Sequence, residues 1–218
     1  MERNSYAESI AHLAESEGVF TTAQAKRLGI PRDALHDAFS SGRVERIMHG
    51  VYRLVGSGAS YTDELVALWK LTAPKQFTHE RIQPGNWDGV TAGGATAASL
   101  LEIGDFHLSP YRVYAPRRIN SRNPSASFAR RIIQREDVTF LHGLLVTRPE
   151  RTVSDLVVDD EDFSLVADVL RDASHKFPEF DYPKLLGFLE EFYGEKRTQE
   201  IYQQLLFDAG ISAESSTR

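Results

Sequence analysis

Residues 20–54, FTTAQAKRLGIPRDALHDAFSSGRVERIMHGVYRL, decide the fold of the first part of this chain. Thr21 and Gln24 have the spacing of a capping box, in which each side chain accepts a hydrogen bond from the backbone amide of the other residue. Gly29 suits the left-handed conformation that ends a helix, and Pro31 suits the first turn of a following helix. We therefore expect two short helices around a tight turn.

The second of these helices, over residues 32–41, is amphipathic. Leu35 and Phe39 lie four residues apart on the side that we expect to be buried. The opposite side is polar and carries basic, acidic and hydroxyl groups. A short helix that presents such a face after a tight turn suits the major groove of DNA.

Beyond this helix the hydrophobic period changes from helical to two, which predicts a β-hairpin. Gly50 falls where a three-residue hairpin loop needs a positive φ. If Ile47 pairs with Val51, then Glu45 lies opposite Arg53 as a favourable cross-strand charge pair. We expect this hairpin to be a wing beside the second helix.

With a further helix predicted at residues 6–17, this order of elements predicts a winged helix-turn-helix, a common DNA-binding module. Two capped helices and a hairpin also occur in domains that bind no nucleic acid. Net charge does not decide between the two, because residues 1–60 carry seven basic and seven acidic side chains. The residues expected to face DNA are Thr21, Thr22, Gln24, Arg32, Asp33, His36, Ser40, Arg43, Arg46, His49, Tyr52 and Arg53.

Composition limits the class of protein. The chain of 218 residues is 41% hydrophobic, which is ordinary for a protein with buried cores, and has no cysteine. Disulfides and thiolate metal sites are thereby excluded. We expect neither a signal peptide nor a membrane-spanning segment, and hence a cytoplasmic protein.

The segment Gly56–Ser60, GSGAS, predicts a flexible linker between two domains. We expect a winged helix-turn-helix at residues 1–56, a mixed α+β domain that ends in helices at 61–211, and a tail at 212–218. The fold class is therefore α+β. In the second domain we expect strands at 111–115, 130–134, 138–141 and 144–146, and helices at 147–158, 163–173, 182–193 and 196–208.

Charge is uneven along the second domain. Residues 151–218 have a net charge of −8, whereas no acidic residue interrupts residues 106–135. This arginine-rich stretch is either a solubilising segment or a second nucleic-acid contact. Its members are Arg112, Arg117, Arg118, Arg122, Arg130, Arg131 and Arg135.

Three segments of the chain resemble a known family. LGIPRDAL at 28–35 and RIMHGVYRL at 46–54 are similar to the winged-helix domain of AbiEi antitoxins, which belong to bacterial type IV toxin–antitoxin systems of the AbiE class, linked to phage defence. GLLVTRPERTVSDL at 143–156 resembles the family's GLPVTxPxRTxxDL segment. The resemblance covers most of the chain up to about residue 175.

The resemblance implies two roles. The winged helix would bind repeated half-sites in the double-stranded DNA of its own promoter and so repress transcription. Two copies of the protein would bind there, and the free protein would be a monomer or a dimer. The second domain would counteract a nucleotidyltransferase toxin without a stable complex. The residues that match the family's helix-and-wing positions are Arg32, His36, Ser40, Arg43, Arg46 and Arg53. No neutralising residue can be carried over, and the arginine-rich stretch is the candidate on charge alone.

Other readings stay open. One is a stand-alone repressor whose second domain senses a ligand or a protein, and another is a nucleic-acid-processing enzyme. Three features are weak candidates for a binding site. The glycine turn at 91–96 either binds an anion or only starts a helix, and Arg151 is either presented to a partner or only pairs with Asp155 along its helix. The acidic residues 159–162 either bind a cation or only cap the next helix. The seven histidines lack metal-ligand spacing. We expect no catalysis, cofactor or metal.

Overall fold

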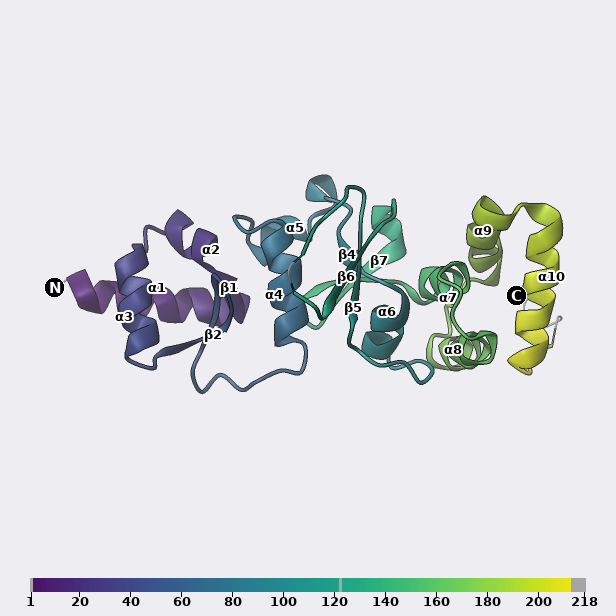
Figure 1. Ribbon diagram of the computed structural model, residues 1–218, viewed down its shortest axis with the longest axis horizontal. Coiled ribbons are helices and arrows are strands. Elements are labelled where there is room, and N and C mark those ends of the chain that lie inside the picture. Colours follow the sequence, from purple (N-terminus) through teal and green to yellow (C-terminus); the bar gives the residue numbers. More distant parts are fainter. Residues whose placement is uncertain (1, 122, 213–218) are drawn as a thin grey trace. The chain divides into compact units, whose positions relative to one another are not determined.

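The computed structural model describes residues 2–121 and 123–212, and the chain divides into two compact units (Figure 1). Unit 1 comprises the residues up to Val90 together with Phe140–Leu144. Unit 2 comprises Thr91–Thr139 and the residues from Leu145 onward.

Unit 1 begins with a winged helix-turn-helix, which confirms the predicted fold. Its antiparallel sheet has the strand order β1-β3-β2, with a core that includes Leu13, Phe20, Leu35 and Val44. The sequence does not predict β1. The six elements are α1 (Glu2–Glu17), β1 (Val19–Thr21), α2 (Thr22–Arg27), α3 (Arg32–Ser40), β2 (Val44–Met48) and β3 (Val51–Leu54).

The local signals around α2 and α3 act nearly as expected. Thr21 and Gln24 form the predicted capping box at the start of α2, with N···O distances of 3.0 and 2.8 Å. Gly29 has a φ of +76° in the turn after this helix. Pro31 is the N-cap of α3 rather than a residue of its first turn, with a φ of −70°.

The hairpin differs from the prediction by one residue. Met48, not Ile47, pairs with Val51, so the loop has two residues and Ile47 sits at a bulge. Because the bulge absorbs the extra residue, Glu45 still lies opposite Arg53 as predicted.

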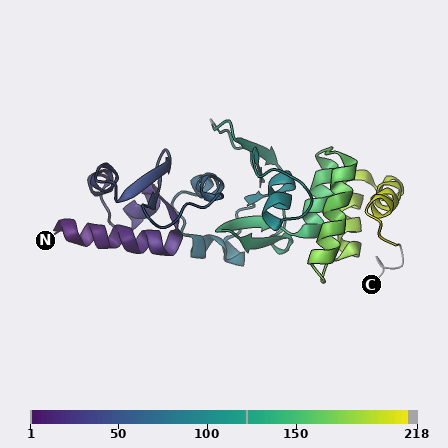
Figure 2. The same ribbon diagram turned by 90° about the horizontal axis from the view of Figure 1, so that it is seen from below.

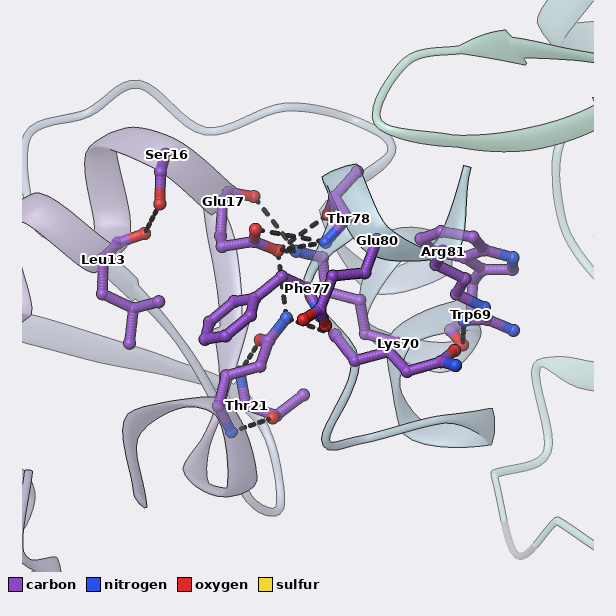
Figure 3. Close-up of polar contacts among 12 residues, drawn as sticks. Leu13, Ser16, Glu17, Thr21, Trp69, Lys70, Phe77, Thr78, Glu80 and Arg81 are labelled. Atoms are coloured by element: carbon purple, nitrogen blue, oxygen red, sulfur yellow. Dashed lines mark hydrogen bonds and ion pairs between the residues drawn. The ribbon is translucent and has the colours of Figure 1, made fainter. Parts of the chain in front are cut away.

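Unit 1 continues through α4 (Asp63–Thr72), α5 (Thr78–Arg81) and the 3-10 turn η1 (Pro84–Asn86). A buried ion pair ties α4 to the end of α1: Lys70 Nζ lies 2.5 Å from Glu17 Oε2, and each side chain is 2% exposed (Figure 3). The same carboxylate accepts hydrogen bonds from the backbone and hydroxyl of Thr78 and from Gln24 Nε2.

Further bonds hold α2 and its N-cap to α5 and the segment before it. Thr21 Oγ1 donates to the carbonyl of Pro74, and Arg27 forms a two-pronged ion pair with Glu80. The division by contacts therefore falls after Val90 and not at the predicted linker Gly56–Ser60. That residues 1–56 fold as a domain of their own stays a prediction.

Unit 2 contains most of a five-stranded sheet of order β6-β5-β4-β8-β7. Strand β4 pairs antiparallel with β5 and parallel with β8, and β5 pairs parallel with β6. The strands are β4 (Thr91–Ala92), β5 (Tyr111–Ala115), β6 (Ala126–Arg130), β7 (Val138–Leu141) and β8 (Leu144–Thr147). The prediction of a strand at 130–134 is wrong, because the pairing with β5 selects residues 126–130 instead.

Five described helices complete unit 2, of which the first packs against β5 of the sheet and against the second. They are α6 (Gly94–Leu101), α7 (Pro149–Val158), α8 (Phe163–Lys176), α9 (Tyr182–Tyr193) and α10 (Glu195–Asp208), with a 3-10 turn η2 (Arg135–Asp137). Figures 1 and 2 show the last four of these packed together, α7 beside α8 and α10 beside α9. The predicted mixed domain that ends in helices is confirmed.

The start of α7 differs from expectation, and most of the predicted C-terminal tail falls on residues that the structure does not describe. The spacing of Thr147 and Glu150 predicts a capping box, but none forms: Arg148 is the N-cap of α7, and Glu150 accepts instead from the amide of Asp181. The predicted tail lies outside the described residues except for Ser212. None of the described helices combines the length and the apolarity that crossing a bilayer requires.

Candidate nucleic-acid interface

Helix α3 presents the polar face predicted for it. Arg32, Asp33, His36 and Ser40 are all exposed, and His36 Nε2 lies 3.5 Å from Ser40 Oγ. Leu35 on the other side is 2% exposed and belongs to the core. The apolar side of the helix is therefore packed on the core, and its polar side is exposed to solvent.

A groove of about 780 Å³ lies between α3 and the hairpin. Its lining includes the side chains of Leu35, Phe39 and Tyr52, and its charged or imidazole side chains are all lysine, arginine or histidine. Among the described residues that line it, none is acidic. The basic and histidine side chains are Lys26, Arg32, His36, Arg46 and His49.

The acidic residues of α3 lie on its other flank. Asp33 and Asp37 line a separate hollow with Tyr6 of α1, together with Ser40 and Arg43. Charge is therefore sorted across the helix although the segment is neutral in total. A negatively charged strand is attracted to the hairpin side and repelled from the opposite side.

The hairpin is held as a fixed wall of this groove. The carbonyl of Gly50 at its tip accepts hydrogen bonds from both the amide and the hydroxyl of Thr22, at 2.9 and 3.1 Å. Gly50 has the predicted positive φ, +77°. This wing is short and tied to the start of α2.

Three predicted DNA contacts need correction because the structure uses their side chains elsewhere. Thr21 and Gln24 are 1% and 0% exposed and hold α2 in place. Arg53 Nη1 lies 2.8 Å from Asp63 and the same guanidinium pairs with Glu45, with 13% of its side chain exposed. We remove these three residues from the candidate interface.

Two other side chains line the groove although the sequence analysis did not place them there. Lys26, in the last turn of α2, lines the groove but was not among the residues predicted to face DNA. The only signal for it in the sequence is its positive charge at the end of this helix. Phe39 was expected to be buried, but it is 38% exposed. Its ring meets Tyr52 edge-on at 6.1 Å, and the guanidinium of Arg46 lies 5.4 Å from its centre.

The arginine-rich stretch of unit 2 divides into inward and outward members. Arg112 and Arg131 pair with Asp159, and Arg131 also pairs with Asp155. Arg135 is half-buried and donates to the carbonyl of Val138.

The remaining members lie at or beyond the ends of two paired strands. Arg130, at the end of β6, is the register partner of Ala115, which ends β5 just before Arg117 and Arg118. All three arginines are exposed. Arg122, which we also predicted for this face, lies outside the described residues.

The Arg151–Asp155 pair is structural. Arg151 Nε lies 2.9 Å from Asp155 Oδ1, and the residues are 4% and 0% exposed, so the alternative that Arg151 is presented to a partner is wrong. Arg131 approaches the same oxygen at 2.7 Å. Burial nevertheless raises the pKa of Asp155 to about 6, against the opposing effect of both arginines.

The glycine turn before α6 accommodates a neighbouring ring. A Cβ atom at Gly93 would lie 2.0 Å from the ring of Tyr114, and the Gly93 amide already donates to the carbonyl of Arg112. These observations favour the structural reading of this turn over an anion site. Burial and nearby carboxylates raise the pKa of the Tyr114 hydroxyl, which donates to Asp159.

The acidic segment 159–162 serves the fold in the same way. Asp162 caps α8 by accepting from the amides of Ser164 and Leu165, and Asp159 neutralises two arginines. Over residues 6–121 and 123–212, no group of three or more histidine or carboxylate side chains is placed to hold a metal ion.

Comparisons with known proteins agree with this picture. The crystal structure of the RV2827C protein from Mycobacterium tuberculosis is similar in fold, with a TM-score of 0.61 and 16% identity over 97% of this chain and 79% of that one. No curated protein matches the chain. Residues 8–55 match the AbiEi_4 family, described as "Transcriptional regulator, AbiEi antitoxin". This match confirms the resemblance seen at residues 28–35 and 46–54.

Proposed function

We propose that this protein is a DNA-binding autorepressor and the antitoxin of a type IV, AbiE-like toxin–antitoxin pair. The observation that carries the proposal is the sorting of charge on α3, with a groove of basic and histidine side chains toward the wing and both aspartates on the far flank. A family match over residues 8–55 supports the regulatory part.

In the proposed complex, α3 enters the major groove and one phosphate strand runs through the groove between α3 and the wing. Arg32 and His36 lie at the start and middle of α3, where side chains of a recognition helix reach base edges. Lys26, Arg46 and His49 supply charge to phosphates, which adds affinity but little sequence information.

Repression follows if the bound protein blocks polymerase at its own promoter. Modules of this kind commonly bind repeated half-sites, so we expect two copies on DNA, in the cytoplasm. Footprinting on the DNA upstream of the gene tests the proposal. The proposal predicts that the wild type protects repeated sequences and that this protection disappears when Arg32 and His36 are both replaced by alanine. If the wild type protects no DNA there, the proposal is refuted.

For the antitoxin role, the described candidates are three exposed arginines, Arg117, Arg118 and Arg130, and Arg122 stays a candidate outside the described residues. A nucleotidyltransferase encoded beside the gene should arrest growth when expressed alone. Co-expression of this chain should restore growth, and replacing the three arginines by alanine should reduce that rescue. The matched control removes three positive charges elsewhere in unit 2, from Arg171, Lys196 and Arg197.

The alternative is a stand-alone repressor in which unit 2 senses a ligand or another protein. Full repression without any effect on a neighbouring nucleotidyltransferase would favour it. Catalysis is not part of the proposal. Cleavage of DNA or RNA by the purified chain with Mg²⁺ or Mn²⁺, abolished by a chelator, would contradict the non-enzymatic reading.

A further inference from the structure

The exposed phenylalanine on α3 has no role in the hydrophobic core that the helical period would assign to it. Phe39 follows Leu35 by four residues, yet Leu35 is 2% exposed and Phe39 is 38% exposed. Its ring forms a T-shaped pair with the ring of Tyr52 in the wing, and the centre of the Tyr52 ring lies 6.2 Å from that of the buried ring of Phe20. A row of aromatic rings therefore leads from the core to the groove.

The groove end of this row carries an arginine. The guanidinium of Arg46 lies 5.4 Å from the centre of the Phe39 ring, within the range of a cation–π contact. Its side chain makes no hydrogen bond or ion pair with any other residue that the structure describes. Glu45, the adjacent carboxylate, is already paired with Arg53.

We infer that Phe39 is a positioning residue for DNA binding, which holds Arg46 so that its guanidinium N–H groups are free to bind a phosphate. An aromatic ring engages the π-face of a guanidinium and leaves its planar fork of donors available, and this fork matches two oxygens of one phosphate. The ring also limits the rotamers of a long side chain that otherwise loses freedom on binding. The inference rests on the proposed DNA-binding function.

The fixed wing makes this arrangement effective. Arg46 is the register partner of Tyr52, and the wing tip is bonded to Thr22, so the backbone beneath the arginine is held on both sides. Phe39 then restrains the part of the side chain that the backbone cannot. The groove thus has a preset cation on its wing wall and Arg32 and His36 on its helix wall.

The test is a double-mutant cycle on the full chain, with binding to a short mixed-sequence DNA duplex measured by fluorescence anisotropy across a salt series. Arg46→Ala should weaken binding and lower the magnitude of the salt slope by about 0.9. Phe39→Leu should weaken binding about two- to fivefold, the factor expected of an exposed cation–π contact. In the Arg46→Ala background, Phe39→Leu should have no further effect.

Three controls separate positioning from folding. Phe39→Tyr keeps a ring and should retain wild-type affinity. Phe207→Leu makes the same change at a phenylalanine that is 80% exposed on α10, and should leave binding unchanged. By NMR, the δ-methylene protons of Arg46 should show an upfield ring-current shift in the free protein that Phe39→Leu removes and Phe207→Leu preserves.

Each outcome has a defined meaning. If Phe39→Leu weakens binding equally with and without Arg46, or not at all, or if the ring-current shift is missing, the positioning role is wrong while the proposed function stands. If the wild type binds neither this duplex nor the DNA upstream of its gene, the proposed function fails and the positioning role fails with it.

Discussion

Replacement of Lys70 by methionine is the sharpest test of how unit 1 holds its winged helix. Lys70 Nζ lies 2.5 Å from Glu17 Oε2 with both side chains 2% exposed, and burial lowers the pKa of Lys70. Without the ammonium group, the Glu17 carboxylate keeps neutral donors from Thr78 and Gln24 but has no paired cation. Leaving one partner of a buried pair uncompensated costs about 3–5 kcal/mol.

We expect the lower end of this range, because three hydrogen bonds still reach the carboxylate. Lys70→Met should therefore reduce the free energy of unfolding, measured by urea denaturation followed by circular dichroism, by about 3 kcal/mol. The double change Glu17→Gln with Lys70→Met removes both charges and should recover part of the loss.

A matched control comes from the same residue type at the surface. Lys176 pairs with Glu102 at 2.8 Å, but the two side chains are 42% and 75% exposed. Lys176→Met should therefore cost no more than about 1 kcal/mol. If Lys70→Met is as mild as Lys176→Met, the buried pair does not anchor α1 to α4 and the reasoning is refuted.

Three further predictions concern single positions. Arg53→Ala should lower the melting temperature but leave the salt slope of DNA binding unchanged, since this guanidinium is already held by two carboxylates; a slope reduced as by Arg46→Ala would return Arg53 to the interface. For Asp155, burial raises the pKa in the folded protein to about 6, from a value near 3.9 in the unfolded chain. The protonated carboxyl therefore stabilises the fold at low pH, and the free energy of unfolding should fall by about 3 kcal/mol as the pH rises from about 4 to 6. Asp155→Asn should remove that part of the pH dependence in urea titrations at a series of pH values, and an unchanged profile would contradict the shift. Gly93→Ala should destabilise the protein by about 1–3 kcal/mol in the same unfolding assay, because its Cβ would overlap the Tyr114 ring, and a neutral result would mean that the ring moves aside freely.

The parts of the fold that were predictable carry their own local signals. The capping box at Thr21 and Gln24 and the glycine at position 29 delimit α2 without reference to the rest of the chain. The long amphipathic helices of unit 2, α8 to α10, follow equally from their periodicity. Local chemistry is enough where an element is long or capped.

The missed strands depend on distant partners. β1 has three residues and β4 has two, too few for a period, and each becomes a strand through pairing with residues well beyond it in the sequence. The strand expected at 130–134 lies at 126–130 because the ladder with β5 fixes its register. Short strands are decided by the sheet that receives them.

The polar face and the hairpin of the candidate interface were predictable, but not the state of every side chain in it. Exposed residues of α3 such as Arg32 and His36 follow from helical geometry alone. Gln24 and Arg53 already had predicted local partners, Thr21 and Glu45, and the structure adds distant ones, the carbonyl of Gln76 and the carboxylate of Asp63. Phe39 was misplaced because the wing covers only part of its ring.

The most direct test of the central claim is a gel-shift titration of the DNA upstream of the gene in the presence of excess unrelated DNA. The wild type should form a specific complex, and Arg32→Ala with His36→Ala should lose about 1–3 kcal/mol of binding free energy per lost base contact while keeping its melting temperature. A folded double variant that binds the upstream DNA as tightly and as specifically as the wild type would contradict the assignment of α3 as the helix that reads DNA.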